Sequence, residues 1–222
     1  MIIIGIDFSI QYPAACISRD FKSFNWVACV NTNTTKIHKR FLDDIGLEFK
    51  NLKFVHLPAR EKGQDTYSAI ERSKLSNYST LVDTFVTEIL AHVKNDDRVI
   101  VSIEGIAYGA QGNALLDIAQ STGMMRKALL DRLLNGHSEK LFIFSPGELK
   151  NAIGAKGNAG KYDVYQTFKE NPSLAVNSDL PNAINKYEDQ ILKKQEVKSP
   201  FMDMIDAYLA VLKIHKSLKE PN

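Results

Sequence analysis

The sequence lacks any apolar run that approaches the roughly 20 residues needed to cross a bilayer. Its first apolar stretch, from Met1 to Ile6, is shorter than a signal-peptide core, has no basic leader before it and is followed at once by Asp7. We therefore expect neither a targeting segment nor a membrane partner.

Cysteine is scarce. The chain has two, Cys16 and Cys29, and both lie in strand-like segments without the spacing of metal ligands. The pattern is typical of buried thiols in a protein of the reducing cytosol.

Neither sign of charge is in clear excess. The chain of 222 residues has 28 basic and 26 acidic side chains, a net charge of +2, and the two signs alternate locally. Charge therefore neither supports nor excludes a nucleic-acid partner, and any positive groove must be created by folding. There is no internal repeat and no low-complexity tract, and the composition, 44% hydrophobic and 24% charged, is that of an ordinary globular protein.

What the chain does have is a strongly apolar start. Residues 1–7 form an almost unbroken run of β-branched side chains that ends in Asp7, and a run apolar on both faces predicts a central strand covered from both sides. An unpaired carboxylate inside such a strand would be very costly, so we expect Asp7 at the exit of the strand, beside a counter-charge.

The remaining pattern predicts an α/β protein. Strands are expected at 14–18, 24–30, 53–57, 98–104 and 141–144, and the first two should form an antiparallel meander with residues 1–7. Helices are expected from Ser68 to Val93, over 112–134, from Ser145, over 161–170 and from Ser199, with capping boxes at Ser68–Glu71 and Ser145–Glu148. Residues 31–51 give no clear element, and 171–198 suggest a mobile loop or an insertion. We expect one domain over 1–222, with insertions near 31–75 and 171–198.

Four acids stand out by their context. Asp7 and Glu104 each end a hydrophobic strand, whereas Asp203 and Asp206 share one face of the last helix, among apolar neighbours. Each signal has an ordinary explanation. A single acid at a strand end is often a turn or cap residue, and an acid pair near a helix start often favours the helix dipole.

Taken together, the four carboxylates predict a metal site. Mg²⁺ and Mn²⁺ prefer oxygen ligands and usually bind through a few carboxylates together with substrate phosphate and water. Two such ions about 4 Å apart can act on one phosphodiester, one activating water and the other stabilising the leaving oxygen.

The ordered set of motifs resembles the RuvC-type Holliday junction resolvases of the RNase H-like nuclease superfamily, a group that includes phage-type members. The matching stretches, in the family's order, are 4–7, 101–104, 119–123, 145–150, the glycine-rich loop 154–161 and 203–210. The resemblance covers about half of the chain, and its most specific part is the Lys156–Lys161 loop followed by the Asp203–Ala207 helix. It implies an RNase H-like mixed five-stranded sheet, an antiparallel meander followed by parallel strands, with helices on both faces.

The resemblance also implies roles for individual residues. Asp7, Glu104, Asp203 and Asp206 would be metal ligands for two Mg²⁺ or Mn²⁺ ions in each active site, and Lys161 would stabilise the charge of the transition state. An ordinary lysine at a helix start is the alternative for Lys161. Contacts to DNA would come from Lys150, Lys156, Lys161 and Tyr108. The family places an aromatic ring just after the second acid; here position 107 is Ala, and Tyr108 is the nearest ring, with an ordinary surface tyrosine as the alternative. The family's glycine-containing turn after the first acid is replaced by Phe8-Ser9-Ile10.

The implied activity is a divalent-metal-dependent endonuclease that resolves four-way DNA junctions as a homodimer, leaving a 5′-phosphate and a 3′-hydroxyl. The helices at 81–93 and 112–134 are the expected dimer face. The expected location is the bacterial cytoplasm, or the host cytoplasm if the protein is phage-encoded. Three alternatives remain: a less selective flap, fork or DNA-packaging nuclease of the same fold, an inactive DNA-binding relative, and an actin-like ATPase. The last is disfavoured because the chain has no Gly-Gly pair for a second phosphate loop.

Overall fold

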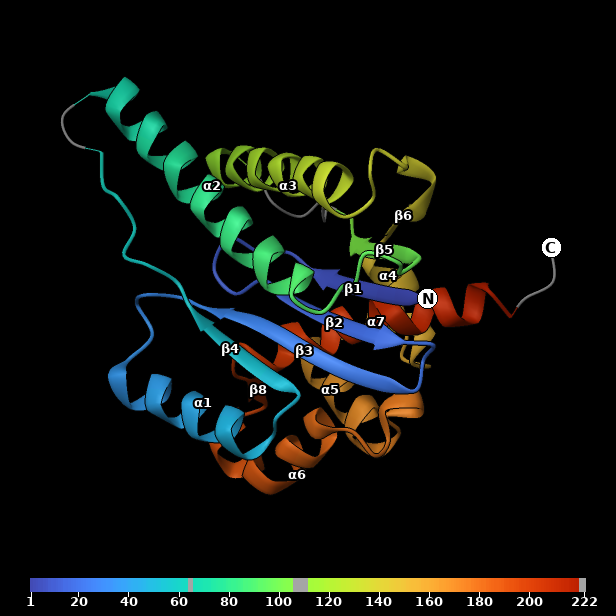
Figure 1. Cartoon of the computed structure of the whole chain (residues 1–222). Helices are drawn as coiled ribbons and strands as arrows, with labels where there is room; N and C mark the ends of the chain where they lie inside the picture. The colour runs from blue at the N-terminus through green and yellow to red at the C-terminus, as the bar shows by residue number, and fades with distance from the viewer. Residues whose placement is uncertain (64–65, 106–111, 220–222) are drawn as a thin grey trace.

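The computed structural model describes residues 1–63, 66–105 and 112–219. Within them, a six-stranded sheet has the order β4-β3-β2-β1-β5-β6, which places the apolar N-terminal strand at its centre (Figure 1). The strands are β1 (Ile2–Asp7), β2 (Ala14–Arg19), β3 (Ser23–Val30), β4 (Leu52–His56), β5 (Val99–Glu104) and β6 (Leu141–Phe144).

The pairing of the strands confirms the predicted fold class. β1, β2 and β3 form the antiparallel meander, and β5 and β6 then add in parallel on the other side of β1. The strand predicted at 53–57 is confirmed as β4, which pairs in parallel with β3, so the five-stranded sheet that the resemblance implies is one strand short for the described residues. A parallel neighbour needs a crossover connection, and α1 (Lys36–Glu48) provides it.

Helices cover both faces of the sheet, as predicted (Figure 1). α2 (Tyr67–Leu90) and α3 (Asn113–Arg132) pack on the face that receives Ile2, Ile4 and Ile6. The opposite face, which receives Ile3, is covered by α1, α4 (Pro146–Ala152), α5 (Lys161–Glu170), α6 (Asp179–Ile191) and α7 (Phe201–Ser217). Side chains therefore alternate between two separate cores along β1, as the pleat of a strand requires.

The last helix, α7, lies directly against β1 because Gly5 has no side chain. A Cβ atom on Gly5 would lie 2.1 Å from the carbonyl oxygen of Ala207 and 2.9 Å from Cγ2 of Val211, far inside normal contact distances. The close approach brings the first turns of α7 beside the end of β1, where Asp7 is located. The absence of a side chain at Gly5 thus allows Asp7, near the start of the chain, to lie close to the acids of α7, near its end.

Several local predictions need correction. Residues 31–51 contain α1, which begins after Thr35, whose side chain accepts a hydrogen bond from the His38 amide. Residues 171–198 are no open loop: they contain a short 3₁₀ turn η2 (Ser173–Ala175), α6 and a small hairpin of β7 (Leu192–Lys193) and β8 (Glu196–Val197). Another 3₁₀ turn, η1 (Ser138–Lys140), precedes β6.

Of three predicted helix N-caps, one is confirmed and two are wrong. The capping box of Ser145 and Glu148 is formed as predicted. α2, however, is capped by Thr66 and not by Ser68. The N-cap of α7 is Pro200 and not Ser199, and a proline side chain has no group that could form a capping hydrogen bond.

Both cysteines are buried and free, as predicted. In the three described ranges, no helix has the length and apolar character required to span a membrane.

Candidate active site

The four acids singled out in the sequence line one cavity of about 370 Å³. It is called the carboxylate cavity below, and its charged lining consists of Asp7, Glu104, Asp203, Asp206, Lys150 and Lys161. The structure thus brings together side chains that are almost 200 positions apart in the sequence. Their roles in catalysis and metal binding stay predictions.

Sheet geometry places the first two acids. β1 and β5 are parallel neighbours with Ile6 opposite Ile103, so both strands end at the same edge of the sheet. Asp7 and Glu104 are the last residues of these strands and therefore lie side by side at that edge. The carboxyl edge of a parallel pair is the usual position of a ligand site in an open α/β sheet.

The other two acids come from α7. Asp203 and Asp206 are three residues apart and therefore lie on the same face of the helix, one turn from each other. Asp203 is buried with a relative exposure of 6%, and its Oδ2 atom is buried without a hydrogen-bond partner among the described residues. A buried, unpaired carboxylate oxygen is costly unless a cation or a donor reaches it, so this atom marks a position for a positively charged ligand.

The pKa values of the four acids record how crowded the carboxylate cavity is. Burial raises the pKa of Asp7 well above its usual range, and repulsion from the other three acids raises it further. Burial, followed by repulsion from Glu104, raises the pKa of Asp206 to about 7. The pKa values of Glu104 and Asp203 are also raised, mainly by burial. The cluster therefore has more negative charge than the surrounding protein can stabilise.

Two lysines offset part of this charge. Lys161, the first residue of α5, lowers the pKa of each of the four acids. Lys150, at the end of α4, opposes the rise in the pKa of Glu104 and also donates a hydrogen bond of 2.7 Å from Nζ to the carbonyl oxygen of Ala159. It thereby connects α4 to the glycine-rich loop that leads into Lys161.

The predicted DNA contacts have different outcomes. Lys150 and Lys161 line the carboxylate cavity, whereas Lys156 lies exposed in the glycine-rich loop and is not part of its lining. Tyr108 lies outside the described residues.

Two serines in the site were missed in the sequence. Ser9 lines the carboxylate cavity and holds the turn after Asp7, because its Oγ accepts a hydrogen bond of 2.9 Å from the amide of Tyr12. Ser199 contacts Asp203 and opposes the rise in its pKa. Ser9 could have been found, because a serine in the segment that follows a strand often accepts a hydrogen bond that forms a turn. Ser199 could not, because its local sequence is that of an ordinary helix cap.

The oxygen donors of the carboxylate cavity are of the kind that binds hard divalent cations. Four carboxylates and an unpaired buried oxygen are the donors that Mg²⁺ and Mn²⁺ select. Within the described residues, however, no group of three or more His, Cys, Asp or Glu side chains has the spacing of a ready-made ion site. Mg²⁺ usually completes its shell with water and substrate phosphate and does not need an all-protein cage, so the donor set remains suitable.

The raised pKa of Asp206 predicts how stability depends on pH. The carboxyl group ionises near pH 4 in the unfolded chain and near pH 7 in the folded one, so the folded state loses stability as pH rises from about 4 to about 7. Without divalent cations, Asp206→Asn should therefore be more stable than the parent at pH 8, on the order of 2 to 4 kcal/mol, and about equal to it at pH 4.

Urea unfolding in EDTA at both pH values measures this difference. Asp44→Asn is the matched control, since Asp44 is exposed on α1 and outside the carboxylate cavity. Adding Mg²⁺ should stabilise the parent protein and not Asp206→Asn. If Asp206→Asn and Asp44→Asn exceed the stability of the parent by the same amount at pH 8 in EDTA, the carboxylates do not repel one another as described.

The sheet order and the acids at the carboxyl edge of its central strands define an RNase H-like architecture. No protein-family model and no curated protein matches the chain. Among solved structures, the chain is similar to RuvC of Thermus thermophilus, with a TM-score of 0.47 and 13% identity over 99% of this chain and 96% of that one.

Two further solved structures are similar to the same degree. T. thermophilus RuvC in complex with a Holliday junction substrate has a TM-score of 0.47 and 14% identity, over 99% of this chain and 95% of that one. The yeast mitochondrial Holliday junction resolvase Ydc2 has a TM-score of 0.46 and 12% identity, over 97% and 83%.

Proposed function

We propose that the protein is a divalent-metal-dependent endonuclease that cuts four-way or otherwise branched DNA. The observation that carries the proposal is the carboxylate cavity, in which four acids from β1, β5 and α7 face two lysines. Such a cluster destabilises the folded chain, as the raised pKa values indicate, and this cost is explained by a function that needs concentrated negative charge.

Asp7, Glu104, Asp203 and Asp206 would hold one or two Mg²⁺ or Mn²⁺ ions. When bound, such ions supply an activated water and stabilise the leaving oxygen of a phosphodiester. The protein itself supplies orientation: β1 and β5 fix Asp7 and Glu104 at one edge, and α7 holds the other two acids opposite them. The Lys161 ammonium would lie beside the reacting phosphate and stabilise the charge that develops on its oxygens.

A four-way junction has two-fold symmetry and needs two cuts, so we infer that the protein works as a homodimer with one carboxylate cavity per subunit. Recognition of a branch would rely mainly on contacts to phosphates and on shape, and affinity should therefore fall steeply with salt.

The test is a nicking assay with synthetic four-way, three-way and linear duplex DNA, with Mg²⁺ and with EDTA. We expect cleavage of the four-way junction in Mg²⁺ only, and much slower cleavage of the linear duplex. Equal rates on all three would favour a less selective nuclease of the same fold, and no cleavage in Mg²⁺ or Mn²⁺ would remove the proposal.

Replacing Lys161 with alanine should lower the single-turnover cleavage rate by about 100-fold and weaken DNA binding by less than tenfold. The reason is that a fixed charge beside the phosphate acts mainly on the transition state. Lys156→Ala is the comparison, because Lys156 is exposed in the adjacent loop and outside the carboxylate cavity. It should weaken binding in a salt-dependent way and keep the rate at saturating DNA. A Lys161→Ala variant that loses only affinity would make Lys161 a backbone contact.

A further inference from the structure

A second pocket adjoins the carboxylate cavity and is not needed to hold a scissile phosphate. This side pocket, of about 540 Å³, lies between the turn that follows Asp7 and the first half of α3. It shares Ser9, Lys161 and Asp203 with the carboxylate cavity, so the two are adjacent. Its size is within the range of small-molecule pockets, about 300 to 1,000 Å³.

The chemistry of the side pocket suits a flat, neutral, partly apolar group. Phe8, Ile10 and Tyr12 line it on the turn, and Ile118 lines it on α3. Asp117, also on α3, faces it with a carboxylate that is paired with Lys74 at 3.1 Å. A nucleobase packs favourably against these apolar and aromatic side chains.

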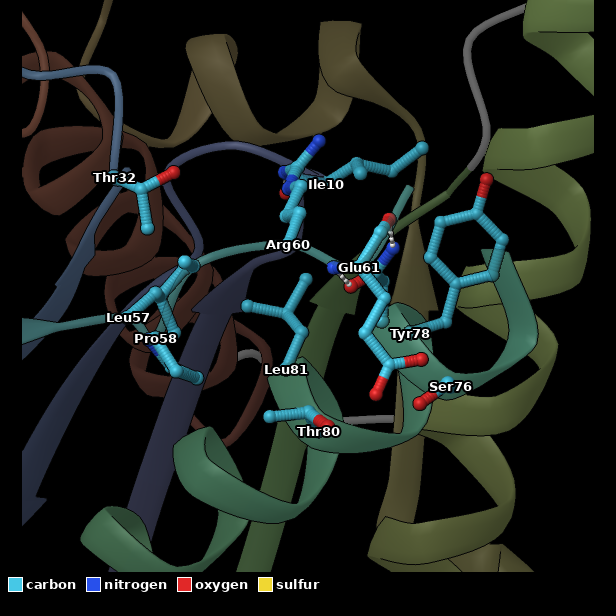
Figure 2. A pocket seen from close by; sticks show the side chains of 12 residues that line it. Ile10, Thr32, Leu57, Pro58, Arg60, Glu61, Ser76, Tyr78, Thr80 and Leu81 are labelled. Carbon is cyan, nitrogen blue, oxygen red and sulfur yellow. Dashed lines mark hydrogen bonds between the residues drawn. The ribbon is translucent and has the colours of Figure 1, made fainter. Parts of the chain in front are cut away.

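The turn that forms one wall is held in place from three directions. Tyr12 donates its amide hydrogen to Ser9, and its hydroxyl lies 3.4 Å from Oγ1 of Thr34. The carbonyl oxygen of Ile10 accepts a hydrogen bond of 2.6 Å from the guanidinium of Arg60, which crosses from the segment after β4 (Figure 2). A wall fixed in this way loses little conformational entropy when a ligand binds.

Figure 2 shows a further cavity, of about 270 Å³, in which Ile10 lies beside Arg60 and near residues of α2. Ile10 lines both this cavity and the side pocket. Ile10, in the turn that departs from the glycine-containing turn of the resembling family, therefore contributes to two cavities.

We infer that the side pocket receives an unstacked nucleobase from a nucleotide next to the scissile phosphate, with the Tyr12 ring and Ile118 as its apolar walls. The inference rests on the proposed function, because it assumes that a scissile phosphate lies in the carboxylate cavity. A strand whose phosphate lies there has its neighbouring base within reach of the side pocket, since the two share lining residues. Branched DNA supplies bases that are easily unstacked.

The experiment uses the full chain and four-way junctions that carry one abasic site, placed immediately 5′ or 3′ of the cleaved phosphate or three nucleotides away. We expect one of the two adjacent abasic sites to lower the single-turnover cleavage rate about tenfold or more. The distant abasic site should have no such effect.

Protein variants connect this effect to the side pocket. Tyr12→Ala should cut the intact junction at about the rate at which the parent cuts the abasic one, and should no longer distinguish the two. Ile118→Ala, on the opposite wall, should reduce the distinction in the same direction. Tyr67→Ala is the matched control, because Tyr67 is 80% exposed on α2 and outside the side pocket.

The outcomes separate the two proposals. Equal cleavage of intact and abasic junctions by the parent protein would overturn the base pocket and leave the nuclease proposal in place, and this comparison requires no variant to fold. An abasic effect that Tyr12→Ala and Ile118→Ala both retain in full would also overturn it. Absence of cleavage on every junction would remove the proposed function, and the base pocket with it.

Discussion

Replacing Asp206 with asparagine should lower junction cleavage by about 1,000-fold or more and change junction binding by less than tenfold. Asparagine keeps the shape of the side chain but removes its charge, and in the proposed nuclease it is charge on the ligands that would hold a cation in the carboxylate cavity. Loss of metal-assisted charge stabilisation amounts to several kcal/mol, which corresponds to about three orders of magnitude in rate. Asp7→Asn should behave in the same way.

Cleavage is measured under single-turnover conditions in Mg²⁺, and binding is measured by gel shift in EDTA. The control is Asp44→Asn, which removes one exposed carboxylate outside the carboxylate cavity and should cut at the parental rate. Cleavage by Asp206→Asn at the parental rate would show that Asp206 holds no ion needed for the reaction.

Gly5→Ala should lower the free energy of unfolding by about 3 kcal/mol or more. The added methyl group would lie 2.1 Å from the carbonyl oxygen of Ala207 and 2.8 Å from the amide nitrogen of Val211, which are backbone atoms that cannot rotate away. α7 would have to move off β1. Because α7 carries Asp203 and Asp206, the protein that still folds should also cut more slowly.

Gly123→Ala provides the contrast. Gly123 lies exposed in the interior of α3, and a Cβ atom there would meet nothing within 4 Å. The change should stabilise the protein by about 0.5 to 1 kcal/mol, because alanine favours a helix more than glycine does. Urea unfolding of both variants measures the difference, and equal stabilities would show that the contact between β1 and α7 is more tolerant than the structure indicates.

The central part of the fold could be predicted because its signals are local. Unbroken apolar runs identified β1 and β5, and short connections implied the meander. α1 and α6 were not recognised, although each has buried apolar residues at helical spacing, Leu42 and Ile45 on α1 and Leu180, Ala183 and Ile184 on α6, because polar residues dominate both segments. Tyr187 of α6 packs its ring edge-on against Phe41 and Phe49, near the end of α1, and donates a hydrogen bond of 2.6 Å to Glu48. These contacts join segments about 140 residues apart, so the packing of α6 on α1 could not be predicted from either segment alone.

The four acids could be found because each ends a strand or interrupts an apolar helix face. Their meeting in one cavity was inferred only from their order along the chain. They come together because Gly5 has no side chain, and the importance of this glycine can be recognised only once the position of α7 is known. Ser199 and the side pocket depend on how the turn, α3 and α7 are arranged in three dimensions.

Because β1 packs against α7, the carboxylate cavity is formed from the earliest and the latest parts of the described chain. During synthesis, Asp7 leaves the ribosome long before Asp206, by about 10 to 40 s at ordinary elongation rates. The nascent polypeptide therefore has no assembled carboxylate cavity until elongation has passed α7, and the proposed nuclease activity would begin only after that point.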